Sequence, residues 1–444
     1  MPINWRLAPP ETKYIVDNGQ ARILLVDPEF VSICGQVEFP SVQVRLVSGD
    51  PADGLQSLEQ WAASHPDLDP GHQPDPDDTA LQLYSSGTTG LPKGVELTYR
   101  SLGAAFQGPV PEAIGYRGEG SVMLNALPTF HIAGIGIGLM TYAYGGKSVL
   151  FPDFNPPQVL DSIAQHGVTH SFLVPAMIQF LLQVPGAAQR DYSSLQYISY
   201  GASPITERVL VDAMKTFGCK FVQVYGLTET SGAITALAAE DHVTDGPKAV
   251  LLRSAGKPIR GVELRAVDSA TGQDVAEGEV GEIWIRTEQN MKGYWRNPQA
   301  TQDAFVDHSP GRMGWFRSGD AGYLRDGYLF LHDRIKDMIV SGGENIYPAE
   351  VENVLMQHPA VADGAVFGVP DERWGEAVKA CVVPKPGSEA SAQGIIEWMR
   401  ERLAHFKCPS SVDFVEAIPR NPSGKILKRI LREPYWEGKE RQIN

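Results

Sequence analysis

A segment rich in glycine, serine and threonine, Tyr84–Val95, has the residue types that hold phosphate groups. Glycines permit tight backbone turns, hydroxyl groups donate hydrogen bonds, and Lys93 adds a positive charge. The segment is not a Walker loop, because Pro92 stands where that pattern needs glycine and no Ser or Thr follows the lysine. We expect a phosphate-binding loop between an apolar strand and a helix; the alternative is an ordinary surface turn.

A second candidate, Tyr225–Thr230, follows the apolar run Lys220–Val224. The end of a strand in an α/β sheet is where ligands bind, and this one carries a tyrosine ring that suits a nucleobase and a carboxylate, Glu229, that suits Mg²⁺. An ordinary strand followed by a turn is the alternative. Asp320 and Arg334 are each most simply read as members of surface ion pairs, and only their combination with the other motifs favours a ligand site.

The segment Arg420–Arg432 carries five basic residues within an acidic protein. Such a helix usually presents a solvated charged face. Lys425 differs from the other basic residues because it follows a Pro-Ser-Gly turn ahead of the helix, from which a loop can deliver its ammonium group into a cleft.

The run Gly134–Gly138 has three glycines, but their spacing does not fit a dinucleotide-binding loop. Small residues at this spacing would let either a chain-like ligand or a neighbouring helix approach the backbone. The adjacent His131 is at least as compatible with a packed core histidine as with a working one.

The elements that must position these residues follow from hydrophobic patterns. Short apolar runs alternate with helix-like segments such as Pro156–His166 from about 80 to 235, which predicts an α/β domain with parallel strands. Segments 262–268 and 282–286 indicate an antiparallel, barrel-like section. After 333, a helix at Pro348–Gln357 and helical spacing from Ile395 to Phe406 predict a small α+β domain. The predicted domains are therefore 1–333 and 334–444.

Composition narrows the function classes. The chain has 444 residues with 38 Lys and Arg against 53 Asp and Glu, a net charge of −15 that opposes nucleic-acid binding. Four widely separated cysteines form no disulfide framework or zinc motif. The longest apolar run, Ile132–Met140, is too short to span a membrane. We therefore expect a cytoplasmic enzyme without transmembrane segments.

Taken together, the motifs resemble those of the adenylate-forming (AMP-binding) superfamily, and most closely its fatty-acid and related acyl-CoA synthetases. They occur in the order and approximate spacing typical of the family, at 84–95, 200–202, 225–229, 315–320, 333–337, 341–350 and 419–425. The resemblance thus extends over about 340 residues.

The resemblance implies a two-step reaction with ATP, Mg²⁺ and coenzyme A. A carboxylate attacks the α-phosphate of ATP to give acyl-AMP and pyrophosphate, and the thiol of coenzyme A then displaces AMP. By the same resemblance, Lys425, Thr228 and Glu229 are catalytic, Glu229 and Ser85 hold the metal, and Lys336 is the hinge of the small mobile domain. The implied ATP-binding residues are Ser85, Ser86, Gly87, Thr88, Thr89, Gly90, Lys93, Gly201, Ala202, Tyr225, Gly226, Thr228, Asp320 and Arg334. The implied coenzyme A path is formed by Ser341, Gly342, Gly343 and Glu344, and the acyl pocket by His131, Gly134 and Gly136.

The chain departs from the family pattern at its beginning. In the family about sixty residues precede the stretch that resembles Pro2–Leu7, and we expect their absence to leave an apolar face of the first sheet uncovered. Two other functions stay open: an adenylating enzyme that loads a separate carrier protein, and a catalytically impaired nucleotide-binding remnant. A medium- or long-chain fatty acid is the expected substrate, with an aryl acid as the alternative. The sequence leaves open whether the protein is a homodimer.

Overall fold

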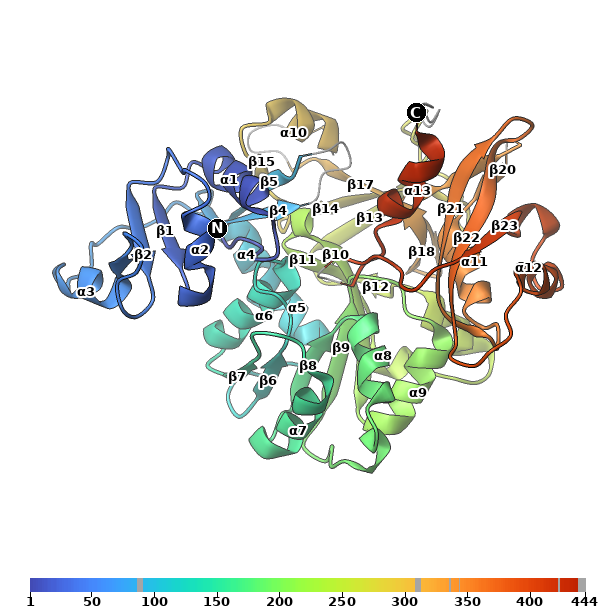
Figure 1. Cartoon of the computed structure of the whole chain (residues 1–444), viewed down its shortest axis with the longest axis horizontal. Coiled ribbons are helices and arrows are strands. Elements are labelled where there is room, and N and C mark those ends of the chain that lie inside the picture. The colour runs from blue at the N-terminus through green and yellow to red at the C-terminus, as the bar shows by residue number, and fades with distance from the viewer. Residues whose placement is uncertain (86–90, 308–312, 335–336, 343, 422–423, 438–444) are drawn as a thin grey trace.

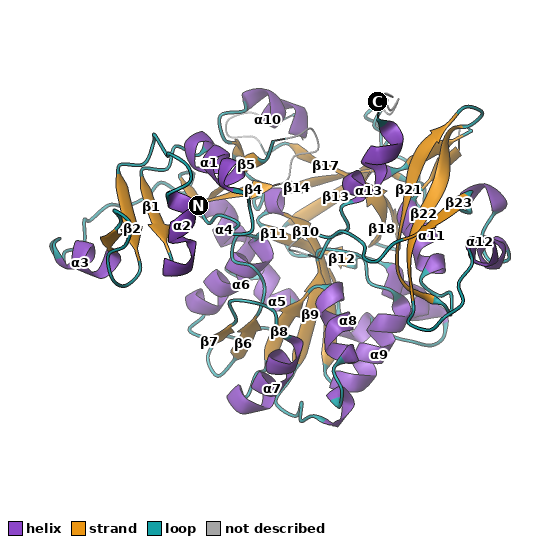
Figure 2. Cartoon of the chain, viewed as in Figure 1, coloured by secondary structure: helices purple, strands orange, loops and turns teal. Residues whose placement is uncertain are grey.

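A computed structural model describes residues 1–85, 91–307, 313–334, 337–342, 344–421 and 424–437. Figure 1 shows an N-terminal unit with β1, β2 and α3 at the left, a central mass of sheets and helices, and a C-terminal unit at the right. Figure 2 shows that helices cover both faces of the lower central sheet. The predicted fold class is confirmed: a mixed α/β protein with a barrel-like β section and a small C-terminal α+β unit.

The largest sheet has seven strands in the order β12-β11-β10-β9-β8-β6-β7. The five strands β10, β9, β8, β6 and β7 are parallel, so their carboxyl ends meet at one edge. The strands are β6 (Val122–Asn125), β7 (Lys147–Leu150), β8 (His170–Leu173), β9 (Tyr197–Gly201), β10 (Lys220–Leu227), β11 (Gly232–Leu237) and β12 (Lys257–Pro258).

The helices around this sheet bury their apolar faces against it. The glycine-rich run lies in α6, which is buried at Gly134, Gly136 and Met140. The helices are α4 (Tyr99–Phe106), α5 (Pro109–Ala113), α6 (Ile132–Ala143), α7 (Pro156–His166), α8 (Pro175–Gln183) and α9 (Glu207–Phe217). The crossover helix predicted at Pro156–His166 is confirmed; its apolar residues Val159, Leu160 and Ile163 lie on one face at helical spacing.

Two small sheets precede the large one. Strands β1 (Ile23–Val26), β2 (Val44–Val47) and β3 (Gln56–Ser57) form a parallel sheet with α1 (Pro9–Asn18), α2 (Val31–Cys34) and α3 (Leu58–Ala63) nearby. Ile23 and Leu25 of β1 are 52% and 55% exposed. That the absence of upstream residues leaves an apolar face uncovered stays a prediction. Strands β4 (Thr79–Ser85) and β5 (Lys93–Thr98) form a hairpin, and β15 (Gly293–Tyr294) pairs with β5.

The barrel-like section is an antiparallel sheet of five strands. It has the order β13-β14-β17-β16, with β18 also paired to β17. The strands are β13 (Val262–Val267), β14 (Gly281–Thr287), β16 (Phe305–Val306), β17 (Trp315–Arg325) and β18 (Tyr328–Arg334), with α10 (Pro298–Ala304) ahead of β16.

The C-terminal unit has its own buried core, which includes Ile339, Val351 and Ile395. Its sheet has the order β20-β19-β22-β21, with β23 paired to β22. The elements are β19 (Ile339–Ser341), β20 (Glu344–Ile346), α11 (Pro348–Leu355), β21 (Val361–Asp371), β22 (Gly375–Pro384), α12 (Ala392–Arg400), β23 (Ser411–Phe414) and α13 (Lys428–Trp436). The predicted boundary between residues 333 and 334 stays a prediction.

Three local expectations were wrong or incomplete. The Gly/Ser/Thr loop leads into strand β5 and not into a helix, because segment 93–98 pairs with β4 before α4 begins at Tyr99. Helix α12 ends at Arg400, and Phe406 lies on a separate short 3₁₀ helix where it is 47% exposed. The sequence pattern did not predict α1.

The four cysteines are free thiols. Among the described residues, no helix combines the length and the apolar character that crossing a membrane requires.

Candidate active site

Glu229 lies at the centre of a hydrogen-bonded cluster at the end of β10. Its Oε1 atom accepts a hydrogen bond from the Ser85 hydroxyl at 3.3 Å and one from the Tyr294 hydroxyl at 3.1 Å. The backbone also holds the residue, since the carbonyl oxygen of Glu229 accepts from the Met291 N–H at 2.7 Å. Three distant chain segments thus converge on one carboxylate.

The turn that carries Glu229 is shaped by its own side chains. Thr228–Thr230 form a short 3₁₀ turn, and the buried Thr230 hydroxyl both accepts from the Leu227 N–H and lies within hydrogen-bond distance of the Gly232 carbonyl oxygen, at 3.0 and 2.8 Å. A Cβ atom on Gly226 would lie 1.8 Å from the Gly232 carbonyl oxygen, so glycine is required for the close approach of β10 and β11. Thr228 lies on this turn beside Glu229.

The residues predicted to border the nucleoside lie at the carboxyl edge of the large sheet. Gly201 ends β9 next to Val224 of β10, and Ala202 follows with a φ of +66°, a backbone conformation rare for residues other than glycine. The Tyr225 hydroxyl donates to Asp320 Oδ2 at 2.7 Å, which joins the large sheet to β17. The structure therefore brings the predicted adenine and ribose residues together.

Asp320 and Arg334 face each other as register partners on β17 and β18. The backbone of Arg334 belongs to the described part of the chain, and its side chain does not. Asp320 is further oriented by a hydrogen bond from its N–H to the Ser318 hydroxyl at 3.1 Å.

The predicted phosphate loop connects the two strands of a hairpin. Ser85 and Lys93 are register partners across β4 and β5. The Nζ atom of Lys93 lies 4.9 Å from the centre of the Tyr294 ring, a cation–π distance. The predicted residues Ser86, Gly87, Thr88, Thr89 and Gly90 lie outside the described residues.

Helix α1 supports this hairpin from one side. The Tyr14 hydroxyl donates to the Pro92 carbonyl oxygen at 3.2 Å, and the Tyr84 hydroxyl donates to Asn18 Oδ1 at 2.6 Å. Burial raises the pKa of Tyr84, so this hydroxyl stays protonated as a donor. The strand ends that carry Ser85 and Lys93 are therefore fixed by a helix that the sequence analysis missed.

Lys425 lies on a turn with its own hydrogen bonds. Its N–H donates to Asn421 Oδ1 at 2.8 Å, and its carbonyl oxygen accepts from the Asn421 N–H at 2.8 Å. Arg420 donates to the Gly424 carbonyl oxygen at 3.0 Å and binds both oxygens of Asp363 at 2.8 and 2.9 Å. The conformation of the turn is thus linked to strand β21.

The Lys425 turn meets the larger part of the protein at the carboxyl end of β8. A Cβ atom placed on Gly424 would lie 3.3 Å from Val174 Cγ2 and 3.4 Å from Ala176 Cβ. These two residues flank the start of α8, and β8 neighbours β9, which ends at Gly201. The structure therefore brings the segment that carries Lys425 to the sheet edge that carries the predicted nucleotide residues.

His131 precedes α6, and its Nε2 atom is buried without a hydrogen-bond partner among the described residues. Burial, with a smaller contribution from Arg6, lowers the pKa of His131 from 6.5 to about 4. The imidazole is therefore neutral at pH 7.

The two glycines predicted for the acyl pocket contact protein atoms. A Cβ atom on Gly134 would lie 2.2 Å from the Pro128 carbonyl oxygen, and one on Gly136 would lie 2.6 Å from the Phe106 ring. The run was predicted to let either a ligand or a neighbouring protein segment approach the backbone, and a neighbouring protein segment explains the contacts at both Gly134 and Gly136. Their place in an acyl pocket stays a prediction.

The residues predicted for the coenzyme A path lie in the C-terminal unit. Ser341 ends β19 and pairs with Glu344 across the β19–β20 hairpin, and the Gly342 N–H donates to the Trp374 carbonyl oxygen at 2.8 Å. Gly343 and the predicted hinge residue Lys336 lie outside the described residues.

The cluster around Glu229 is compatible with Mg²⁺. The described residues hold no group of three or more His, Cys, Asp or Glu side chains that could bind a metal. Mg²⁺ is commonly bound through one or two carboxylates together with waters and the phosphates of a nucleotide, so a single carboxylate beside the predicted phosphate-binding hairpin fits it. In that arrangement Glu229 would hold the ion, and Mg²⁺ would neutralise charge on the phosphates.

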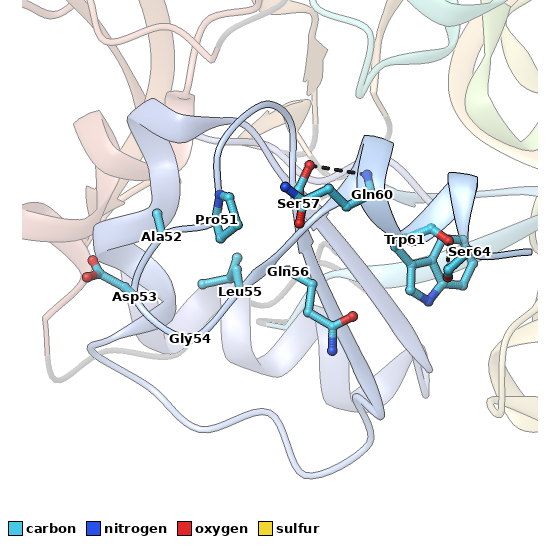
Figure 3. Close-up of a pocket in the computed structure, with 10 residues that line it drawn as sticks. All are labelled: Pro51, Ala52, Asp53, Gly54, Leu55, Gln56, Ser57, Gln60, Trp61 and Ser64. Carbon is cyan, nitrogen blue, oxygen red and sulfur yellow. Dashed lines mark hydrogen bonds between the residues drawn. The ribbon is translucent and has the colours of Figure 1, made fainter.

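A hollow of about 540 Å³ is lined by residues between 51 and 64, in the N-terminal unit and not at the cluster around Glu229. Figure 3 shows its lining around β3 and α3, including Leu55, Gln60 and Trp61. None of the predicted site residues lines it, so we assign it no part in the site.

Sequence reasoning missed Tyr294, Asn421 and Asp363. Tyr294 stands in a Gly-Tyr-Trp run, a pattern with no chemical signature of its own. Asn421 shapes the turn that carries Lys425 through a local hydrogen bond, and Asp363 acts on it through Arg420, a contact between distant residues that only the tertiary structure reveals.

Comparison with known proteins decides the family. Residues 1–295 match the AMP-binding enzyme family, and residues 350–425 match the AMP-binding enzyme C-terminal domain. The chain belongs to this family of adenylate-forming enzymes. The predicted family and the predicted class, an AMP-forming acid–thiol ligase, are therefore confirmed at the level of the family.

Several known proteins are similar to this chain over almost its whole length. A fatty acid–[acyl-carrier-protein] ligase of Streptomyces coeruleorubidus is 39% identical over all of this chain and 83% of its own length. The long-chain-fatty-acid–CoA ligase FadD13 of Mycobacterium tuberculosis and a feruloyl-CoA synthase of Amycolatopsis are both 37% identical, each over 98% of this chain and 83% of its own length. ATP-bound MatB from Rhodopseudomonas palustris superimposes with a TM-score of 0.86 at 29% identity, covering 99% of this chain and 84% of MatB.

Proposed function

We propose that this adenylate-forming enzyme activates a medium- or long-chain fatty acid as acyl-AMP and transfers the acyl group to coenzyme A. In the first step a carboxylate oxygen bonds to the α-phosphorus of ATP, and the bond to the β-phosphate breaks to release pyrophosphate. In the second step the sulfur of coenzyme A bonds to the carbonyl carbon, AMP leaves with its oxygen, and the thiol proton passes to solvent.

The observation that carries the proposal is that the segments carrying Lys425, Lys93 and Glu229 lie near one sheet edge. The first step joins two anions, so its barrier falls when cations are fixed where negative charge gathers. The Gly424–Lys425 turn packs against Val174 and Ala176 beside the strand that ends at Gly201. Lys93 and Glu229 lie near the same edge, around Tyr294. In our proposal Lys425 bridges the carboxylate and the α-phosphate, while Lys93 and Mg²⁺ on Glu229 bind the β- and γ-phosphates.

Two features support an aliphatic acid. The surroundings of the glycines predicted for the acyl pocket are apolar: Phe106 would lie 2.6 Å from a Cβ atom placed on Gly136 of helix α6 and 3.7 Å from one placed on Gly232. Two relatives, at 39% and 37% identity, carry fatty acids in their names. An aryl acid is the alternative, since a feruloyl-CoA synthase is equally close.

The acid is tested by ATP–pyrophosphate exchange with a panel of straight-chain acids from six to eighteen carbons and with ferulate and benzoate. We expect exchange that depends on the acid and rises with chain length into the medium or long range. Exchange with the aryl acids alone would contradict the proposed substrate, and exchange with none of the acids would contradict the proposed activity.

The acyl acceptor has a second candidate. The relative named as a carrier-protein ligase matches the whole of this chain, which favours a separate acyl carrier protein as the alternative to coenzyme A. Acyl-AMP formed on the enzyme is offered free coenzyme A or a phosphopantetheinylated carrier protein. Thioester formation on coenzyme A is expected; transfer to the carrier alone would favour the second candidate.

A further inference from the structure

We propose that Tyr294 is a positioning residue that fixes the metal-binding carboxylate and the phosphate-binding lysine relative to each other before MgATP binds. The inference rests on the proposed function and adds to it. The Tyr294 hydroxyl donates to Glu229 Oε1 at 3.1 Å, and the face of its ring lies 4.9 Å from Lys93 Nζ. One side chain therefore contacts both charged groups.

The fold places this tyrosine with little freedom. Tyr294 of β15 pairs with Val95 of β5, and Val95 lies two residues after Lys93 in the chain. Its N–H donates to the Thr301 hydroxyl at 2.8 Å, which ties it to helix α10. The next residue is anchored as well, because the Trp295 N–H donates to the Gly94 carbonyl oxygen at 2.7 Å and its indole N–H donates to the Asn18 carbonyl oxygen at 2.9 Å.

The same segment is also tied to the turn that carries Glu229. The Met291 N–H donates to the Glu229 carbonyl oxygen at 2.7 Å, three residues before Tyr294. Segment 291–295 thus links β10 to the hairpin of β4 and β5. A backbone held at both ends lets the tyrosine set the distance between the carboxylate and the hairpin.

The hydroxyl and the ring of Tyr294 contact groups of opposite charge. Its hydroxyl is a donor and suits the carboxylate, while the electron-rich face of the ring attracts the ammonium group. Side chains held in their bound rotamers lose less entropy when the ligand arrives. Removing the hydroxyl should therefore affect the metal, and removing the ring should additionally affect the phosphates.

The test compares Tyr294→Phe with Tyr294→Leu in acid-dependent ATP–pyrophosphate exchange. Tyr294→Phe keeps the ring and loses one of the two hydroxyl contacts to Glu229 Oε1; the other comes from Ser85. We expect its half-saturating Mg²⁺ concentration to rise about tenfold, as for loss of a hydrogen bond to a charged group. Its KM for ATP at saturating Mg²⁺ should change by less than about twofold because the cation–π contact is kept.

Tyr294→Leu should show the same Mg²⁺ effect together with a further rise of about threefold in KM for ATP. The matched control is Tyr99→Phe at the exposed start of α4, where the residue is 50% exposed and all constants should equal those of the wild type. Thiolysis of supplied acyl-AMP by coenzyme A uses neither the β- and γ-phosphates nor the metal, so both Tyr294 variants should retain it.

An unchanged Mg²⁺ requirement in Tyr294→Phe would overturn the inference, as would equal KM values for ATP in the two variants. An equal loss of thiolysis would show that the tyrosine only supports the fold. If the wild type gives no acid-dependent exchange, the proposed function fails, and calorimetric titration of ATP at limiting Mg²⁺ into wild type and Tyr294→Phe still decides this inference: equal affinities at limiting Mg²⁺ refute it, and weaker binding by the variant that saturating Mg²⁺ restores supports it.

Discussion

The two charged regions of the candidate site are held in different ways. Around Glu229, hydrogen bonds and a cation–π contact join side chains from β4, β5, the turn after β10 and β15 into one cluster within the larger part of the protein. The Lys425 turn is shaped by Asn421, Arg420 and Asp363 of the C-terminal unit, and Gly424 meets the larger part through apolar contacts with Val174 and Ala176.

This difference suits a reaction in two steps. Burial of two small apolar groups contributes only about 1 kcal/mol, so loss of this one contact would cost little and would leave the hydrogen bonds of the turn itself in place. The cluster around Glu229 would lose hydrogen bonds to a charged group if it opened, which costs more. A rigid phosphate site combined with a preformed but detachable lysine turn would allow Lys425 to act in one step and withdraw in the other.

The sharpest test of this comparison is Lys425→Ala. In our proposal Lys425 acts only while the turn is docked, so acid-dependent pyrophosphate exchange should fall by about a hundredfold or more. Thioester formation from supplied acyl-AMP should stay near the wild-type rate. The two steps are measured separately, and equal loss in both would contradict a lysine that serves one step.

The larger part of the protein, which holds the cluster around Glu229, also buries His131, and this residue predicts an effect of pH on stability. His131 is buried with a pKa of about 4, against 6.5 for the exposed group. As pH falls below 6.5 the unfolded chain binds the proton first, so the free energy of unfolding decreases, by about 1.4 kcal/mol per pH unit until pH 4.

Replacing this residue should remove that loss. Between pH 7 and pH 5 the decrease for His131→Phe should be smaller than for the wild type by about 2 kcal/mol in urea unfolding. His72→Phe, in the exposed connector before β4, is the matched control and should follow the wild type. Parallel profiles for His131→Phe and the wild type would argue against a neutral buried imidazole.

A smaller effect is expected from the support of the Lys425 turn. Asp363→Asn removes the charge that holds Arg420, whose guanidinium also donates to the Gly424 carbonyl oxygen. Exchange should fall about tenfold, as for loss of a charged hydrogen-bonded pair, with thiolysis retained. Glu401→Gln, which weakens the exposed pair with Arg402, should change neither step. An unaffected exchange rate in Asp363→Asn would show that the turn holds its shape without Asp363.

The smallest effect tests the docking contact itself. Gly424 has a φ of +79°, and a Cβ atom there would press on Val174 and Ala176. Gly424→Ala therefore combines backbone strain with a crowded contact, while Gly387→Ala, with φ of +74° and no atom within 4 Å, carries the strain alone. Exchange by Gly424→Ala should fall about threefold below that of Gly387→Ala. Equal exchange rates in the two variants would show that the first step does not depend on the contact of Gly424 with Val174 and Ala176.

The sequence anticipated the regular elements well where periodicity was strong. The helix at Pro156–His166 and the strand beginning at His170 agree with the structure. It failed at the phosphate loop, because whether segment 93–98 forms a strand or a helix depends on pairing with β4. Sequence analysis also missed α1, because its residues give only a weak helical pattern. This helix matters through its hydrogen bonds with Pro92, Tyr84 and Trp295, which are distant in the sequence.

By itself the sequence determined the order of the motifs, the α/β class and the family, since residue types and their spacing are properties of the chain. Only the tertiary structure decided which distant groups touch: that Tyr294 links Glu229 to Lys93, that Phe106 fills the space beside Gly136, and that the Lys425 turn rests on Val174 and Ala176. The physical reason is that these contacts depend on strand order and on the packing of separate elements, which local propensity does not encode.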